Sequence, residues 1–267
     1  MHKRTCGFTL IELCIVLTVV GLLVGGTLAG RNLVRAAEIR SVLNDTEKWQ
    51  SAIQQFRSKY RAMPGDMKNA TQFWGAVAGG TAIGIDATCQ AYFDSTHTPV
   101  QATCNGDGDG KVERNGNNWN EPWRLWQHLA DAGMIQGMYT GQGSGPIGGG
   151  GSSVPKDGLS APSSRVNSLT YLIMWEDAVT ASDLERFAGD YGNTMRIGQK
   201  SEVDGSVMSA SEAFSLDSKF DDGAPGTGAV RSYKNSRRPG CASSDDPLTA
   251  TYQNRDDIGC NLLIIIP

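Results

Sequence analysis

The sequence is short of histidine and lacks the common catalytic motifs. Its three histidines, His2, His97 and His128, lie far apart, and none belongs to an H-E-x-x-H metal-binding pattern. Neither a G-x-S-x-G nucleophile turn nor a phosphate-binding P-loop is present. Catalysis therefore finds little support, and we expect His128 to be an ordinary polar residue on a helix.

An excess of either charge is also missing. The 267 residues include 24 basic and 28 acidic side chains, which gives a formal net charge of −4. Proteins that bind nucleic acid through its phosphates carry a basic patch or a high isoelectric point, and this balance indicates neither. We therefore expect no nucleic-acid partner.

The sequence has one long apolar run, at its N-terminus. Residues 8–30 are almost all apolar or small and could cross a bilayer core as a helix. Basic residues before the run, Lys3 and Arg4 among them, favour a cytoplasmic N-terminus and place the remainder outside. The run contains one acid, Glu12, and no basic residue. Because a lone carboxylate in a membrane costs about 3 kcal/mol, Glu12 needs a partner from another molecule or from a new N-terminus.

The segment from Gly7 to Leu13, G-F-T-L-I-E-L, resembles the cleavage and methylation motif of type IV prepilins and of type II secretion pseudopilins. In that family a membrane peptidase cuts after the glycine and methylates the new N-terminal phenylalanine, and an acid at the fifth mature position guides assembly. The resemblance implies cleavage between Gly7 and Phe8, N-methylation of Phe8 and an assembly role for Glu12. The new amino group would lie near the depth of a neighbouring subunit's Glu12, which then has a partner.

Two plainer interpretations of the apolar run remain. A secretory signal peptide could end near Ala29, although its apolar region is normally only about 7 to 15 residues long. A simple signal anchor explains the hydropathy but leaves Glu12 unexplained.

The run also departs from many type IV pilins, which have proline at the position of Ala29. It contains instead four glycines whose spacing allows helices to approach closely: Gly21, Gly25, Gly26 and Gly30.

Helical periodicity continues through residues 31–62, which contain neither proline nor glycine. Large side chains recur there at alternating steps of three and four residues: Ile39, Val42, Thr46, Trp49, Ile53, Phe56 and Tyr60. This spacing predicts an amphipathic helix whose apolar stripe packs against a sheet. Pro64 and Gly65 should end the helix. Together with residues 8–30 it would form one long spine after a cleaved leader, residues 1–7.

We expect residues 63–267 to form a single head outside the membrane. Sequence patterns predict two helices and three strands there: residues 69–77 and 121–132 as helices, and 168–176, 193–198 and 262–266 as strands. The glycine-rich stretch 141–158 is expected to be a flexible loop inserted in the head. The predicted fold class is α+β and pilin-like, a long helix packed on an antiparallel sheet with irregular loops stapled by disulfides.

Four of the six cysteines lie in the predicted head. Their positions as two local pairs favour Cys89 with Cys104 and Cys241 with Cys260 among the three possible connectivities. Such bonds persist in an oxidising compartment, which for a bacterial protein is the periplasm or beyond. Four reduced, buried thiols are the alternative.

An acidic segment in the first half of the head is a candidate calcium site. Asn105, Asp107 and Asp109 alternate with glycines, as in the opening of an EF-hand loop. The twelfth position is Gly116, where a bidentate glutamate is required. A different set of oxygen ligands could be completed by Glu113, Asn117 or Glu121. Plain turn chemistry is the alternative, because Asp-Gly repeats also favour turns.

A second acidic segment contains Asp217, Asp221 and Asp222, followed by a glycine-rich stretch, residues 223–228. It is similar in placement only to the calcium-binding loop of major pseudopilins, and no motif matches residue by residue. The alternative is a helix end followed by a turn. Ca2+ is therefore a possible ligand of either segment.

The resemblance implies a structural function, as a filament subunit rather than an enzyme. The implied partners are a prepilin peptidase, other pilin or pseudopilin subunits and an inner-membrane assembly platform. The implied location is the bacterial inner membrane, crossed once, with the head in the periplasm. A type II secretion pseudopilin is our first interpretation, because acidic loops favour it. A major or minor type IV pilin is the alternative, favoured by a C-terminal disulfide, and a membrane-tethered periplasmic enzyme is a distant one.

Overall fold

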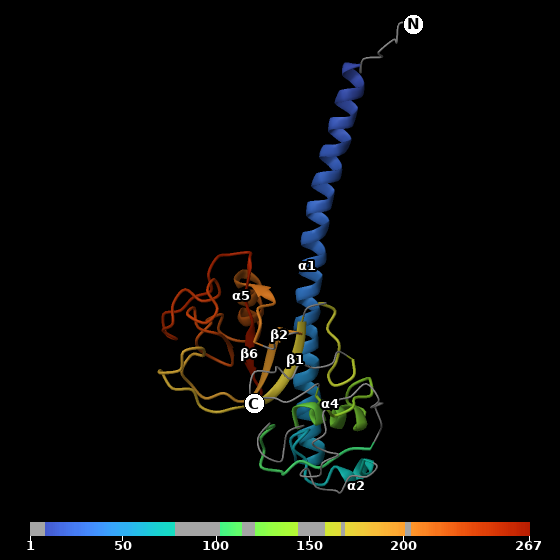
Figure 1. The fold of residues 1–267 in the computed structure, drawn as a ribbon, viewed down its shortest axis with the longest axis vertical. Helices are drawn as coiled ribbons and strands as arrows, with labels where there is room; N and C mark the ends of the chain where they lie inside the picture. Colours follow the sequence, from blue (N-terminus) through green and yellow to red (C-terminus); the bar gives the residue numbers. More distant parts are fainter. Residues whose placement is uncertain (1–8, 78–101, 114–120, 144–157, 167–168, 201–203) are drawn as a thin grey trace, which may run out of the picture.

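A computed structural model defines the fold for residues 9–77, 102–113, 121–143, 158–166, 169–200 and 204–267. One long helix, α1, carries a head on its C-terminal half, and its N-terminal half projects free of the head (Figure 1). The head combines antiparallel strands with three shorter helices. This is an α+β, pilin-like architecture, and it confirms the predicted fold class.

Helix α1 (Leu10–Tyr60) runs without interruption for 51 residues. The predicted membrane segment and the predicted amphipathic segment are therefore one continuous helix. It ends at Arg61, whose left-handed backbone (φ 54°) closes the last turn through a hydrogen bond from its N–H to the carbonyl of Arg57. Among the described helices, α1 alone is long and apolar enough to cross a membrane.

The predicted apolar stripe of α1 is buried as expected. Six of its seven members are buried, and the seventh, Tyr60, is partly buried and packs against the core. Trp49 lies at the centre of the contact, with its ring edge-on to Trp126 at 5.4 Å and to Tyr171 at 6.4 Å between ring centroids. Large aromatic side chains that interlock in this way contribute strongly to core stability, so the stripe is what joins the head to the spine.

The main sheet has four antiparallel strands in the order β1-β2-β6-β4. Their bounds are Leu169–Glu176 for β1, Gly192–Gln199 for β2, Leu262–Ile265 for β6 and Val230–Ser232 for β4. A second pair joins β3 (Met208–Ser209) to β5 (Ile258–Cys260). The three predicted strands are confirmed to within one residue at each end. The other three were not predicted, because strands of two or three residues are too short to show a period of two.

Three helices complete the described head: α2 (Thr71–Trp74), α4 (Glu121–Asp131) and α5 (Ala210–Phe220). Helix α4 agrees with its predicted segment to within one residue, and Gly133, with φ +71°, follows its end as expected. Helix α2 lies inside the predicted segment 69–77 but covers only four of its residues. Helix α5 was not predicted as a helix. It starts with a capping box in which Ser209 and Glu212 each bond the other's backbone N–H.

His128 is buried and fully bonded, so the expectation of an ordinary polar residue was wrong. Its Nδ1 accepts a hydrogen bond from the backbone N–H of Gly65 at 2.9 Å. Its Nε2 lies 3.0 Å from Thr103 Oγ1 and 3.2 Å from the carbonyl of Cys104. The imidazole therefore joins the turn after α1 to the loop at residues 103–104. The period of α4 gave no sign of this, since almost the whole circumference of the helix is buried.

A disulfide joins Cys241 to Cys260 with 5.0 Å between Cα atoms, as predicted. Cys104 is also disulfide-bonded, and Cys89, its predicted partner, lies outside the described residues. Most of the glycine-rich stretch 141–158, residues 144–157, likewise lies outside them. The bond closes the loop that precedes β5 and fixes it to that strand.

Candidate functional site

Glu12, the acid that has no basic partner within the apolar run, caps the N-terminus of α1. Glu12 Oε2 accepts from the backbone N–H of Thr9 at 2.8 Å and from its hydroxyl at 2.7 Å. In return, Thr9 Oγ1 accepts from the backbone N–H of Glu12 at 3.3 Å. The first amides of a helix have no partner within it and carry a partial positive charge, so they stabilise a nearby carboxylate. Glu12 therefore has a partner in its own chain, which the sequence analysis did not anticipate.

Gly7 and Phe8, the residues of the predicted cleavage point, lie outside the described residues. Thr9 follows Phe8, so both members of the capping box remain in the chain after a cut between Gly7 and Phe8. The box can therefore hold the start of α1 both before and after processing. Capping and pairing with a new amino group are compatible, because a carboxylate has four lone-pair sites.

The projecting half of α1 presents an apolar surface that no described part of the head covers. From Leu10 to Thr27 the side chains are exposed all round the helix. The apolar surface continues beyond Arg31, since Leu33 is 73% and Val34 is 62% exposed. A surface of this size requires lipid or other helices around it.

The first predicted cation site gathers a different set of residues from the one expected. Oxygens of Asp66, Asp107 and Asp109 lie within 4.8 Å of one another. Asn105 instead accepts from the backbone N–H of Thr71 at 2.9 Å. The amino group of Lys111 lies 3.7 Å from a carboxylate oxygen of Glu113. The predicted Asn105 and Glu113 are thus engaged elsewhere, and Asn117 lies outside the described residues. Asp66, which was not predicted, and Glu121, one of the named additions, lie beside Asp107.

Asp66 lies at the centre of this cluster. It is almost fully buried, and it accepts hydrogen bonds from the amides of Gly108 at 2.6 Å and Gly110 at 2.8 Å. Burial raises the pKa of Asp66 to about 7, against the effect of these two bonds. The loop lies so close that a Cβ on Gly106 would fall 2.4 Å from the Asp66 backbone. Asp66 was not predicted to belong to the site, because Pro64 and Gly65 before it were interpreted only as a helix stop.

Glu121, the first residue of α4, is the second buried carboxylate of the cluster. It accepts from the backbone N–H of Glu113 at 2.8 Å and from that of Asp107 at 3.4 Å. Burial, with Asp66 and Asp107 nearby, raises its pKa to about 9. A set of carboxylate oxygens without nitrogen or sulfur is the ligand type that Ca2+ prefers.

The second predicted site brings Asp217, Asp221 and Asp222 together, also within 4.8 Å. Each carboxylate stabilises the turn that follows α5. Asp217 accepts from the hydroxyl of Tyr252 at 2.8 Å, and burial raises its pKa to about 7. Asp222 accepts from the hydroxyl of Thr227 at 2.6 Å, and Asp221 accepts from two amides at the start of β4. These are the contacts of a helix end followed by a turn.

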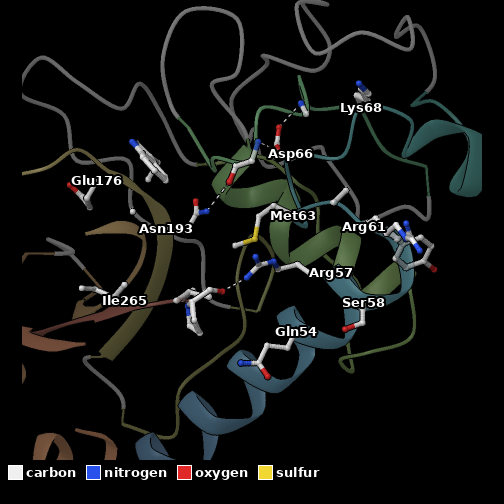
Figure 2. A pocket seen from close by; sticks show the side chains of 18 of the residues that line it. Gln54, Arg57, Ser58, Arg61, Met63, Asp66, Lys68, Glu176, Asn193 and Ile265 are labelled. Carbon is white, nitrogen blue, oxygen red and sulfur yellow. Dashed lines mark hydrogen bonds between the residues drawn. The ribbon is translucent and has the colours of Figure 1, made fainter. Parts of the chain in front are cut away.

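A cleft of about 1460 Å³ opens at the end of the head far from the projecting half of α1. Figure 2 shows Gln54, Arg57 and Ser58 of α1 along one wall, with Asn193 and Ile265 from the sheet on the other side. Arg57 donates to the carbonyl of Pro267, the last residue. Charges of both signs line the cleft, and Asp66 is among its lining residues.

Comparison with known proteins gives one finding, at the N-terminus. Residues 2–28, about a tenth of the chain, match the family model described as the prokaryotic N-terminal methylation motif. No curated protein and no solved structure matches the chain. The matched residues include Glu12 and lead directly into the exposed apolar half of α1. The chain thus carries the prepilin-type cleavage and methylation motif, joined by one continuous helix to a pilin-like α+β head.

Proposed function

We propose that this protein is a structural subunit of a type IV pilus-like filament, with a pseudopilin of type II secretion as the first assignment. A prepilin peptidase would cut between Gly7 and Phe8 and methylate Phe8. The observation that carries the proposal is the methylation motif at residues 2–28, which continues without a break into a helix with an exposed apolar half. A structural subunit needs this arrangement, because the same surface contacts lipid before assembly and neighbouring helices afterwards.

The precursor would cross the bacterial inner membrane once, with residues 1–7 in the cytoplasm, residues 8–30 in the bilayer, and residues 31–62 and 63–267 outside. Basic residues before the apolar run support this orientation. The disulfide between Cys241 and Cys260 supports a periplasmic head, because such bonds persist where the compartment is oxidising. The remaining partners would be sibling subunits and an inner-membrane assembly platform.

Glu12 would take part in assembly through its charge, by pairing with the new amino group of a neighbouring Phe8. The capping box provides a way to test this, because a glutamine at the same position can still accept from the Thr9 amide. Glu12→Gln therefore keeps the cap and removes the charge, whereas Glu12→Ala removes both. Glu47→Ala is a matched control, since Glu47 is exposed on α1 outside the apolar run.

The experiment measures membrane insertion, processing and incorporation into filaments for all three variants in the native host. We expect each variant to insert and to be cut, and both Glu12 variants to be absent from filaments while Glu47→Ala is incorporated. Normal incorporation of Glu12→Gln would show that capping alone is sufficient and would refute the charge pairing. A mature N-terminus other than Phe8 would refute the processing step itself.

The disulfide between Cys241 and Cys260 favours the alternative assignment, a major or minor type IV pilin, because pilins commonly have a disulfide near the C-terminus. Deletion of the coding sequence separates the two machines. Loss of exoprotein release with unchanged surface filaments supports the pseudopilin, and loss of surface filaments with normal release supports the pilin. Turnover of a substrate by the purified chain would overturn both in favour of the tethered enzyme.

Calcium binding at the cluster of Asp66, Asp107, Asp109 and Glu121 is proposed as a second property. The supporting observation is that Asp66 and Glu121 are both buried, and neither forms an ion pair with a described cationic side chain. Ionising a buried carboxyl that has no cationic partner is costly, which is why both pKa values are raised, and a bound cation would offset that cost. A bound Ca2+ would join the turn after α1, the loop at residues 107–110 and the start of α4.

A further inference from the structure

The head begins where the apolar surface of α1 ends, with no spacer between them. Leu33 and Val34 are still exposed apolar residues, and the next residue, Arg35, is already bound to the head. Its guanidinium lies 2.6 Å and 2.9 Å from the two carboxylate oxygens of Glu212 and 2.9 Å from the carbonyl of Val207. This paired contact fixes the edge of the head beside the last apolar turn of the helix.

Two segments form that edge, residues 207–212 and 255–258, and we call them together the membrane-facing edge. Residues 207–210 are buried and support it from inside, whereas residues 255–258 are its exposed part. They are joined by pairing of Ser209 with Ile258 between β3 and β5. The hydroxyl of Ser211 also lies 3.4 Å from a carboxylate oxygen of Asp256. Figure 1 shows α5 and its neighbouring loops at the end of the head nearest the projecting half of α1, with α2 at the opposite end.

The depth of this edge follows from helix geometry. Gly30 ends the apolar run, and at 1.5 Å per residue Arg35 lies about 7.5 Å further along the axis. The headgroup layer on each side of a bilayer is about 5 to 8 Å thick. A helix that fills the bilayer core with residues 8–30 therefore places Arg35, and the edge it holds, at the level of the lipid headgroups. Tilt of the helix would bring the edge closer still.

The chemistry of the edge fits that position. Ile258 is 63% exposed, although a β-strand residue of this size is normally buried. Beside it in the chain are Arg255, Asp256 and Asp257, all exposed, and Arg255 pairs with Asp257 at 2.8 Å. Arg31 is exposed one residue after the apolar run. The edge thus offers an apolar side chain together with both cations and anions, which suits a surface that carries both phosphate and ammonium groups.

We infer that the membrane-facing edge docks on zwitterionic phospholipid headgroups, with Ile258 inserted between them. The basic side chains would meet phosphate, and Asp256 would meet ammonium. The head would then have a fixed orientation on the bilayer before assembly, because it is held both by α1 and by this second contact. This inference rests on the proposed membrane anchorage and adds a lipid-binding surface to it.

Photolabelling of the full chain tests the inference. The protein is reconstituted into vesicles of phosphatidylethanolamine and phosphatidylcholine that contain a trace of lipid with a photoreactive headgroup, and labelled peptides are mapped by mass spectrometry. We expect label on α1 near Arg31 and on residues 255–258. Ile258→Asp should reduce head labelling by at least about threefold without changing the labelling of α1.

Leu184→Asp is the matched control. Leu184 is 81% exposed, so the change is equally tolerated, and the nearby Arg186 pairs with Glu176 at the far end of β1. The control should leave the labelling unchanged. Label on α1 without label at residues 255–258, or equal label at residues 183–186, would overturn the lipid contact and leave the filament proposal standing. Absence of label from α1 itself would refute the membrane anchorage and the inference together.

Discussion

Replacing His128 by glutamine should change how the stability of the head depends on pH. The imidazole is fully buried, and burial lowers its pKa to about 3, helped by the positive charge of Arg124 on the same helix. In the unfolded chain a histidine has a pKa of about 6.5. Between these two values the unfolded chain binds a proton that the folded chain does not, so folding is disfavoured as the pH falls.

The magnitude follows from the two pKa values. The stabilising effect of the neutral His128 is fully present above pH 6.5 and is lost as the pH falls toward 3. One pKa unit corresponds to about 1.4 kcal/mol, so the loss between pH 7 and pH 5 is about 2 kcal/mol. The pKa of Asp131, which burial raises to about 7, has the opposite effect over the same range. The wild type and the variant must therefore be compared at each pH.

The assay is urea unfolding of the full chain in detergent, followed by tryptophan fluorescence at pH 7, 6 and 5. Trp126 and Trp123 are fully buried in α4 and report on loss of the core. We expect the stability difference between wild type and His128→Gln to shrink by about 2 kcal/mol from pH 7 to pH 5. Leu129→Ala, a cavity-forming control on the same helix, should cost about 2 to 5 kcal/mol at every pH. A difference for His128→Gln that does not change with pH would refute the assignment.

Two further outcomes are expected. Gly7→Val should block processing, so that mass spectrometry finds the intact precursor, whereas the wild type should begin with a methylated Phe8; cleavage of the variant at the same bond would contradict this. Excess Ca2+ should raise the melting temperature of the purified chain, a chelator should reverse the rise, and Asp66→Asn should abolish it. Identical melting temperatures with and without Ca2+ would dismiss the proposed cluster.

Much of the fold could be predicted from the sequence, because long elements repeat their pattern many times. The stripe from Ile39 to Tyr60 covers six turns of one helix, and β1 covers eight residues, so both periods were clear. Strands β3, β4 and β5 could not be found in this way, since two or three residues show no period. The start of α5 was visible as Ser209 and Glu212 in capping-box spacing, a signal that was present and missed.

The first acidic cluster shows what spacing alone could not predict. The alternation of Asp107 and Asp109 with glycine located the loop correctly, but Asp66 reaches it from about forty residues earlier in the chain. Glu121 was considered only as one of several possible additions. Which carboxylates converge depends on how the turn after α1 packs on α4. His128 holds the turn after α1 against α4 by accepting a hydrogen bond from Gly65. Because these two residues are far apart in the sequence, no local sequence pattern predicts this contact.

The unbroken course of α1 makes it a lever. With 51 residues it is about 76 Å long, and the head is fixed to its outer half by the buried stripe and by Arg35. A change of tilt of about 5° about the centre of the membrane run would move the end at Tyr60, about 62 Å away, sideways by about 5 Å, since displacement grows with distance from the pivot. Small rotations imposed on the membrane segment by neighbouring subunits would thus become large displacements of the head.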